Sequence, residues 1–146
     1  MIHVKRVADY FLSLVREDEG DLMTNLKLQK LLYYAQGFHL AMFSKPLFDK
    51  KIEAWVYGPV VPYIFKKYEN YGSGAIPSKQ NSDFSDIDNE TRALLDEVYT
   101  VYGQFSASTL KDIVKTEPPY FNTPMRGVIE HSAMIDFFQT KINHTV

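Results

Sequence analysis

The chain has 146 residues, of which 45% are hydrophobic and 23% charged, the size and composition of one folded domain and not of a disordered protein. Its formal net charge of −2 gives no reason to expect strong non-specific attraction to nucleic acid or to anionic membranes. There is no cysteine, which excludes disulfides, thiolate catalysis and cysteine-based zinc sites. A signal-peptide pattern and an apolar run of the roughly 18–20 residues that span a bilayer are both missing, so we expect a cytoplasmic protein.

Hydrophobic periodicity predicts two helices in the first third of the chain. In residues 4–15 the apolar side chains lie largely on one helical face, and a charged run with a final glycine ends the helix. Residues 26–42 keep the i, i+3, i+4 rhythm most closely, with Thr24 or Asn25 as the N-cap. Pro46 ends this second helix, because a proline disfavours helical backbone in the residue before it.

The middle of the chain changes from an extended pattern back to a helical one. Residues 50–57 alternate apolar and polar side chains with the period of a short strand, which a Gly-Pro pair ends. Helical periodicity returns over residues 60–71. Glycine, serine, proline and asparagine are then frequent in residues 72–88, which we interpret as a long polar loop with one short strand around Ala75.

Three further helices complete the expected fold. Their predicted ranges are 89–102, 107–115 and 132–142. Asp86 or Asp88 caps the first of them, Ser106 caps the second, and a Pro-Pro pair ends the second. Together the elements predict a mainly α fold, a compact single-domain bundle of about five to seven helices over residues 1–146, with a small β element near residues 50–57.

The residue types that most enzymes use for catalysis form no recognisable motif in this chain. The four histidines, His3, His39, His131 and His144, lack the i, i+3 or i+4 spacing of a zinc site, and we expect His39 to be a hydrogen-bonded packing residue. No Gly-x-Ser-x-Gly elbow and no phosphate-binding glycine loop is present. We therefore expect a protein that is not an enzyme, with no catalytic residues, no metal site and no cofactor.

Aromatic residues make up 14% of the chain, including ten tyrosines, and they gather with polar residues in three places. These places are the helical segment 26–36, the strand segment 53–60 and the proline-bounded segment 117–120. Tyrosine and tryptophan often anchor protein interfaces, because each combines a large apolar ring with a polar tip. The alternative interpretation of each tyrosine is a place at the margin of the core.

The same segments resemble a known family. The runs LKLQKLLYYAQ (26–36), PLF (46–48) and IEAWVYGPV (52–60), followed by residues 102–110, resemble the Panacea-domain family in this order. The resemblance implies a predominantly helical fold with a small strand element. The best-known members of this family are antitoxins that neutralise diverse toxins by protein–protein contact, and other members are phage-associated or mobile-element proteins. The resemblance also implies a connection to regulated proteolysis, which is known for some members.

The chain departs from the family pattern in two places. Val114-Lys115 stands where the family typically has a Thr-His pair, and Pro119-Tyr120 stands where it typically has Pro-Trp. The first change replaces a hydroxyl and a titratable imidazole by an apolar group and a fixed cation. A ligand-binding or catalytic role of that pair would be lost here, whereas binding of a partner through surface shape would survive.

From these residues and the resemblance we expect an antitoxin or a mobile-element accessory protein that binds and neutralises a partner toxin. The expected partner-binding residues either contact the partner or form the polar frame that shapes the contact surface. They are Lys27, Lys30, Tyr34, Trp55, Tyr57 and Tyr63. The aromatic residues would supply most of the affinity, and the lysines would attract an acidic area of the partner.

Two alternatives remain open at this point. The first is a phage or host regulator that acts as a proteolysis adaptor, docking a host protein without neutralising a dedicated toxin. The second is nucleic-acid binding through Lys27, Lys30, Lys66 and Lys67, which the net charge of −2 disfavours. We expect no membrane partner. The identity of the partner and the oligomeric state are not encoded in any pattern that we recognise.

Overall fold

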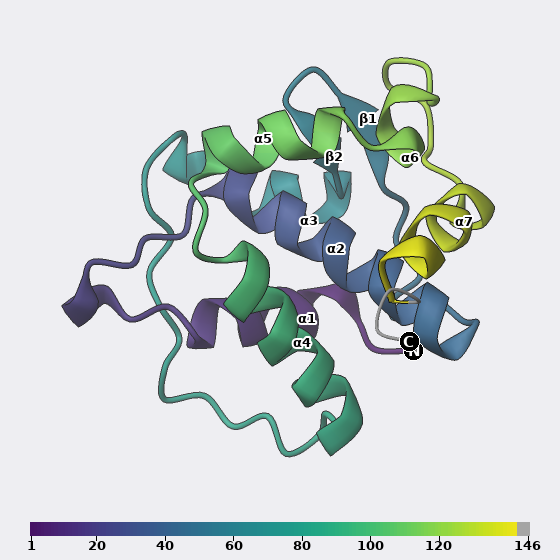
Figure 1. Ribbon diagram of the computed structural model, residues 1–146. Helices are drawn as coiled ribbons and strands as arrows, with labels where there is room; N and C mark the ends of the chain where they lie inside the picture. Colours follow the sequence, from purple (N-terminus) through teal and green to yellow (C-terminus); the bar gives the residue numbers. More distant parts are fainter. Residues whose placement is uncertain (143–146) are drawn as a thin grey trace.

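The computed structural model describes residues 1–142 as a helical bundle with one small hairpin (Figure 1). Its α-helices are α1 (Val4–Ser13), α2 (Asn25–Phe43), α3 (Pro62–Lys67), α4 (Asn89–Tyr102), α5 (Ala107–Lys115), α6 (Pro118–Phe121) and α7 (His131–Ile142). Short 3₁₀ helices lie at Glu17–Glu19 and Glu69–Tyr71, and strand β1 (Glu53–Trp55) pairs with strand β2 (Gly58–Val60). The predicted fold class, mainly α with a small β element, is confirmed.

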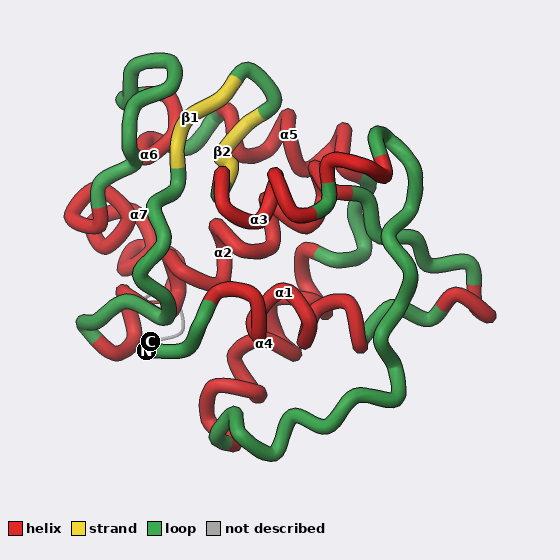
Figure 2. The backbone as a smooth tube through the Cα atoms, turned by 180° about the vertical axis from the view of Figure 1, so that it is seen from behind, coloured by secondary structure: helices red, strands yellow, loops and turns green. Residues whose placement is uncertain are grey.

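Helix α2 lies at the centre of the bundle, with α1, α3, α4, α5 and α7 packed around it (Figure 1, Figure 2). A helix enclosed over most of its surface has no broad solvent-facing polar stripe, and α2 buries its glutamines as well as most of its leucines. The Gln29 side-chain carbonyl accepts from Val61 N–H at 2.8 Å, and that of Gln36 accepts from Leu47 N–H at 2.7 Å. These bonds compensate the burial of both amides and attach two connecting segments to the helix.

Helices α2 and α7 approach closely because α2 has a glycine where they meet. A side chain at Gly37 would overlap the ring of Phe138 in α7. That ring packs edge-on against Tyr33 and Phe38, with centroids 5.4 and 4.9 Å apart. Although α7 comes last in the chain, it therefore closes the core around the central helix.

Three helices begin at the predicted capping residues. Thr24, Asp88 and Ser106 each accept a hydrogen bond from the backbone N–H three residues later, at 3.2, 2.7 and 3.1 Å. Such caps satisfy N–H groups that a helix leaves unpaired at its first turn. Because the signal is local, α4 and α5 have the bounds that the sequence predicts.

The structure differs from the predicted pattern at the hairpin and after α5. Residues 58–60, expected to end a strand and begin a helix, form β2 instead, and β1 is only three residues long. Pro118, expected only to end a helix, also begins α6, because proline at the first helical position loses no hydrogen bond. The β2 strand exists because it pairs with β1 across a two-residue turn, which the helical periodicity of residues 60–71 does not record.

The long loop 72–88 runs across α1 and is attached to it by polar contacts (Figure 2). The Lys79 ammonium lies 2.9 Å from the Asp9 carboxylate of α1. Ala75 forms one isolated β-bridge with Thr24 in place of the short strand expected there. The loop is therefore held against the bundle by contacts within the chain itself.

Candidate functional site

The β1–β2 hairpin turns on two exposed apolar residues. The strands pair antiparallel with Trp55 opposite Gly58, which leaves Val56 and Tyr57 as a two-residue turn. Gly58 has a φ of 110°, a conformation that glycine adopts without steric cost. Val56 is 56% exposed and Tyr57 is 52% exposed. The turn thus presents two large apolar side chains to solvent.

A segment that follows α6 braces the hairpin. The Arg126 N–H donates to the Ala54 carbonyl at 2.6 Å, and the Ala54 N–H donates to the Gly127 carbonyl at 2.9 Å. Glu53 and Val128 form a further β-bridge. Figure 1 shows the hairpin, α6 and the loop after α6 together at one end of the molecule. Two parts of the chain that are about 70 residues apart therefore share one surface.

Five exposed apolar residues gather at this end, and we call them the hairpin patch. They are Val56, Tyr57, Phe121, Met125 and Val128. The last three, from α6 and its loop, are 56%, 58% and 42% exposed. Apolar side chains grouped in one area mark interaction sites more often than isolated ones do. The hairpin patch is therefore the candidate surface for contact with a partner.

Trp55, beside this patch, is half-buried and held by its neighbours. Its indole N–H donates to the Glu53 carboxylate at 2.9 Å, and the Arg126 guanidinium lies 4.0 Å from the ring centroid. Phe65 of α3 packs edge-on against the ring at 5.1 Å. The hydrogen bond from the indole, with Lys51 also 3.0 Å away, lowers the pKa of Glu53. Contacts within the chain thus fix the position of the ring.

Deeper in the molecule, two adjacent tyrosines of α2 converge on one buried carboxylate. The hydroxyls of Tyr33 and Tyr34 donate to the two oxygens of Glu117, each at 3.0 Å. Glu117 is 5% exposed, and burial raises its pKa to about 7 although both hydrogen bonds favour the charged form. Tyr34 also stacks on Tyr102, with the centroids 3.8 Å apart. This cluster connects the central helix to α4 and to the residue before α6.

Lys30 is buried under the hairpin without an acidic partner among the described residues. It is 1% exposed, and burial lowers its pKa to about 7, with a smaller contribution from the positive charges of Lys111 and Lys115. A Cβ atom added at Gly58 would lie 2.9 Å from Lys30 Cε. The hairpin therefore covers this side chain directly, and the positive φ of Gly58 favours glycine at this position.

The structure separates two further residues of the predicted set from the hairpin patch. Lys27 is half-buried, and its ammonium donates to the Gly103 carbonyl at 2.6 Å. Tyr63 of α3 is 39% exposed, and the ammonium groups of Lys50 and Lys67 lie 4.8 and 5.1 Å from its ring centroid. Both side chains thus have contacts within the chain.

Of the six predicted residues, Trp55 and Tyr57 lie together on the hairpin, whereas Lys30 and Tyr34 are inside the protein. Each predicted residue was expected either to contact the partner or to belong to the polar frame beneath the contact surface. Because Lys30 and Tyr34 are buried, only the second role is possible for them. The sequence did not decide between the two roles, because the elements that enclose α2 are distant along the chain. Glu117 was missed as the partner of the tyrosines, although segment 117–120 stood out for its polar and aromatic residues.

The family model described as "Antitoxin SocA-like, Panacea domain" matches residues 28–120, which is more than half of the chain. The chain belongs to this family. The part of the Panacea domain that matches includes most of α2, the whole hairpin and Glu117. The resemblance identified from the sequence is thus confirmed.

A similar protein is "Antitoxin SocA" of Caulobacter vibrioides (strain NA1000 / CB15N). It is 42% identical over 50 residues, which are 34% of this chain and 27% of that protein. The matched segment therefore spans well under two thirds of the relative's length. No solved structure matches this Panacea-domain chain.

In residues 1–142 of this Panacea-domain protein, no group of three or more histidine or acidic side chains is placed to hold a metal ion. His39 Nδ1 lies 2.7 Å from the Lys45 carbonyl, which confirms its predicted packing role. His144 falls outside the described residues. No helix in the described part of the chain is both long and apolar enough to cross a membrane.

Proposed function

We propose that this Panacea-domain protein is an antitoxin that binds a partner toxin in the cytoplasm and neutralises it by protein–protein contact. The observation that carries the proposal is the family match over residues 28–120, which includes the hairpin and the frame beneath it. The similar protein is itself named an antitoxin. In this proposal the whole chain acts as one domain and supplies no catalytic group.

The hairpin patch is the proposed contact, with Tyr57 as an aromatic anchor in the patch and Trp55 as a second anchor beside it. Aromatic side chains dominate the binding energy of many interfaces. The backbone hydrogen bonds between Ala54 and residues Arg126 and Gly127 hold the hairpin in shape, so binding would cost little ordering of the chain. A toxin covered by this surface would lose access to its own substrate, which is neutralisation by steric occlusion.

The direct test is co-expression with a candidate toxin, chosen as a small reading frame next to the gene of this chain. Neutralisation predicts that growth resumes and that the two proteins co-purify. Continued growth arrest together with a failure to co-purify would contradict the proposal. Co-purification without resumed growth would instead support a regulator or proteolysis adaptor that binds the same partner.

A pair of matched variants tests the hairpin patch itself. We expect Tyr57→Asp to weaken binding of the co-purified toxin by about 30-fold, the effect of losing an anchor worth about 2 kcal/mol. Tyr71→Asp is the control, because Tyr71 is 44% exposed on another surface, in the 3₁₀ helix after α3. Binding constants can be measured by isothermal titration calorimetry. If the two variants weakened toxin binding equally, the hairpin patch would not be the contact surface.

A further inference from the structure

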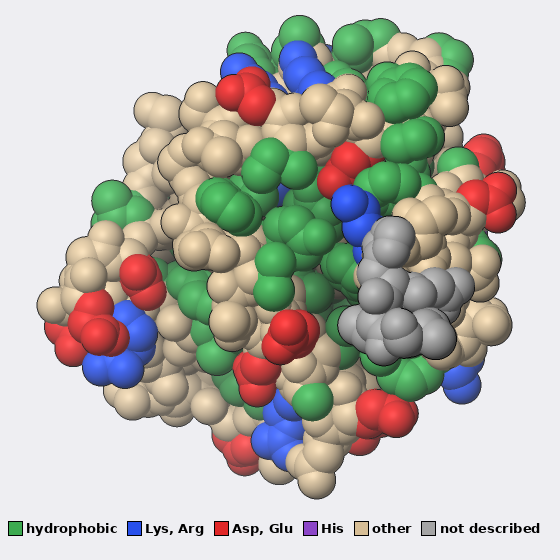
Figure 3. All heavy atoms as spheres, viewed as in Figure 1, with side chains coloured by type: hydrophobic (Ala, Val, Ile, Leu, Met, Phe, Trp, Pro, Cys, Tyr) green, Lys and Arg blue, Asp and Glu red, His purple; other side chains and the backbone are tan. Residues whose placement is uncertain are grey.

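A second apolar surface, which shares no residue with the hairpin patch, lies between α2, α4 and α7. It is a groove of about 390 Å³. Its lining residues are Phe38, Met42, Glu90, Ala93, Leu94, Glu97, Val98, Val101, Tyr102 and Ile142. Figure 3 shows a hollow with apolar side chains between α4 and α7, and acidic side chains along its α4 edge. Apart from two glutamates, every lining residue is apolar or aromatic.

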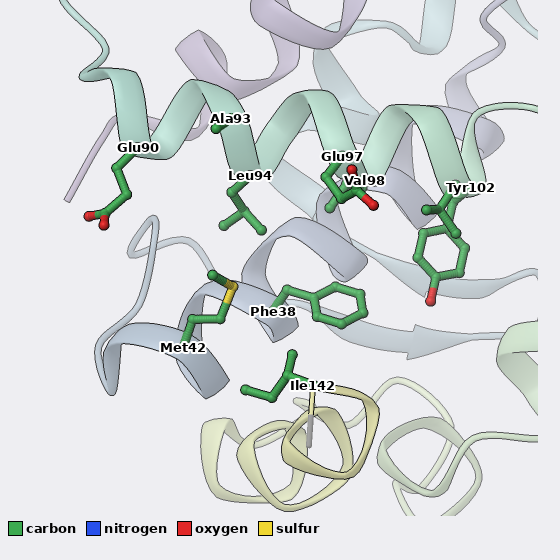
Figure 4. Close-up of a pocket in the computed structure, with 10 residues that line it drawn as sticks. Phe38, Met42, Glu90, Ala93, Leu94, Glu97, Val98, Tyr102 and Ile142 are labelled. Carbon is green, nitrogen blue, oxygen red and sulfur yellow. The ribbon is translucent and has the colours of Figure 1, made fainter. Parts of the chain in front are cut away.

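Helix α4 forms one wall along the full length of this groove. Glu90, Leu94, Glu97 and Val101 follow one another at spacings of three and four, which places them on one face of the helix. From the first to the last of them the wall is about 16 Å long, or about three turns. Phe38 and Met42 of α2 form the facing side (Figure 4). The groove is thus an elongated channel parallel to a helix.

The groove is open to solvent and not an internal cavity. Met42 is 49% exposed and Val101 is 39% exposed, although both are large and apolar. Leu94 of α4 is 7% exposed and forms the base of the wall, which is part of the floor of the groove. Exposed apolar side chains at the margins with a buried apolar floor are the arrangement that a partner helix fills when it docks in a groove.

The acidic side chains at the margin of the groove indicate that a molecule bound there would carry positive charge. Glu90 and Glu97 are exposed, and within residues 1–142 neither pairs with a cation or accepts a hydrogen bond. They are seven residues apart, which on a helix is two turns or about 10 Å. Two carboxylates at this separation can pair with two cations that are seven residues apart on a second helix lying alongside. In a small-ligand site, by contrast, the few polar groups converge on one point.

We propose that this groove binds an amphipathic helix of a partner protein. The helix presents apolar residues at i, i+3 or i+4, and i+7 to the floor, and lysine or arginine seven residues apart to Glu90 and Glu97. The proposal does not rest on the antitoxin role, because the groove and the hairpin patch are separate. It gives the chain a second docking site with a preference for basic partner helices.

Two designed helical peptides of about 14 residues test the proposal. They share one leucine stripe and differ at two edge positions seven residues apart, which are lysines in one and glutamates in the other. Fluorescence anisotropy with the full chain measures affinity, and NMR shifts of Leu94 and Val98 locate the site. We expect the lysine peptide to bind about tenfold more tightly, since two exposed charge pairs replace two repulsions.

Charge-reversal variants sharpen this test. In the double variant Glu90→Lys and Glu97→Lys the preference should reverse, so that the glutamate peptide binds about tenfold more tightly. The control is the double variant Glu17→Lys and Glu69→Lys, which changes the net charge equally at exposed positions outside the groove. It should keep the original preference.

Val101→Asp should weaken both peptides at least tenfold, since it places a charge on the apolar wall. Circular dichroism confirms that each variant is folded.

The proposal is overturned if neither peptide shifts the NMR signals of the groove residues, if both peptides bind equally, or if the control variant reverses the preference. It is also overturned if a chain ending at Ile142 binds tenfold more tightly than the full chain, because the chain's own last residues then occupy the groove. Sedimentation showing a dimer that Val101→Asp dissociates would assign the groove to a second copy.

Discussion

The cluster around Glu117 and the hairpin patch use tyrosine in opposite ways. In the cluster, the hydroxyls of Tyr33 and Tyr34 are both bonded to a carboxylate and the rings are fully buried. In the patch, the ring of Tyr57 is more than half exposed. The high aromatic content of this sequence therefore has two structural origins, buried tyrosines in the core and exposed aromatic residues on the surface. Rings whose hydroxyls are hydrogen-bonded inside the protein belong to the core, whereas the exposed ring of Tyr57 belongs to the candidate contact surface.

If the cluster is structural, its removal should have the largest effect on stability. Glu117→Ala leaves two buried tyrosine hydroxyls without their acceptor, and we expect a loss of about 3 kcal/mol in the free energy of unfolding. Urea denaturation at pH 8 measures this loss. Glu117→Gln, which keeps one acceptor oxygen, is the control and should lose less. A loss below about 1 kcal/mol for the alanine variant would contradict the assigned role.

The two buried titrating groups predict a stability minimum near pH 7. The pKa of Glu117 is raised from 4.5 to about 7, so the folded protein binds its proton more tightly and stability falls as pH rises from 4.5 to 7. The pKa of Lys30 is lowered from 10.5 to about 7, so the unfolded chain binds its proton more tightly and stability rises above pH 7. Each limb should change the free energy of unfolding by about 2 kcal/mol over two pH units.

Single variants identify the group behind each limb. Glu117→Gln should flatten the change between pH 5 and 7, and Lys30→Met should flatten the change between pH 7 and 9. Urea denaturation across this range gives both curves. A Lys30→Met curve that still rises above pH 7 would show that another group is responsible for the alkaline limb.

The hairpin patch should show the smallest effect on stability. We expect Phe121→Ser to change the free energy of unfolding by less than about 0.5 kcal/mol, because the side chain is 56% exposed. The same variant should weaken binding of the co-purified toxin if the patch is the contact. Thermal unfolding and calorimetry measure the two effects separately. A stability loss above about 1 kcal/mol would place Phe121 with the frame and not with the patch.

Features that depend on neighbouring residues were predicted well from the sequence. Side-chain caps at Asp88 and Ser106 and the helical rhythm that follows them determine α4 and α5, so their bounds could be identified before the structure was known. The same holds for the polar loop 72–88, whose composition is typical of turns.

Features that depend on distant residues could not be predicted in this way. Glu117 meets Tyr33 across 84 residues, and Val128 reaches the hairpin only through backbone pairing with Glu53. No local pattern marks either contact. The burial of Lys30 was unexpected for a related reason: a lysine on a helix normally faces water, and only the hairpin and the helices packed around α2 remove that possibility.

The close packing of α7 on α2 has a consequence for the limits of the domain. The family match ends at residue 120, yet Phe138 of α7 fills the space above Gly37 and contacts Tyr33 and Phe38. A fragment cut at the limits of the match would expose this aromatic face to water. The segment that matches the family is therefore shorter than the segment that packs into one core, and a fragment designed to fold alone should include α7.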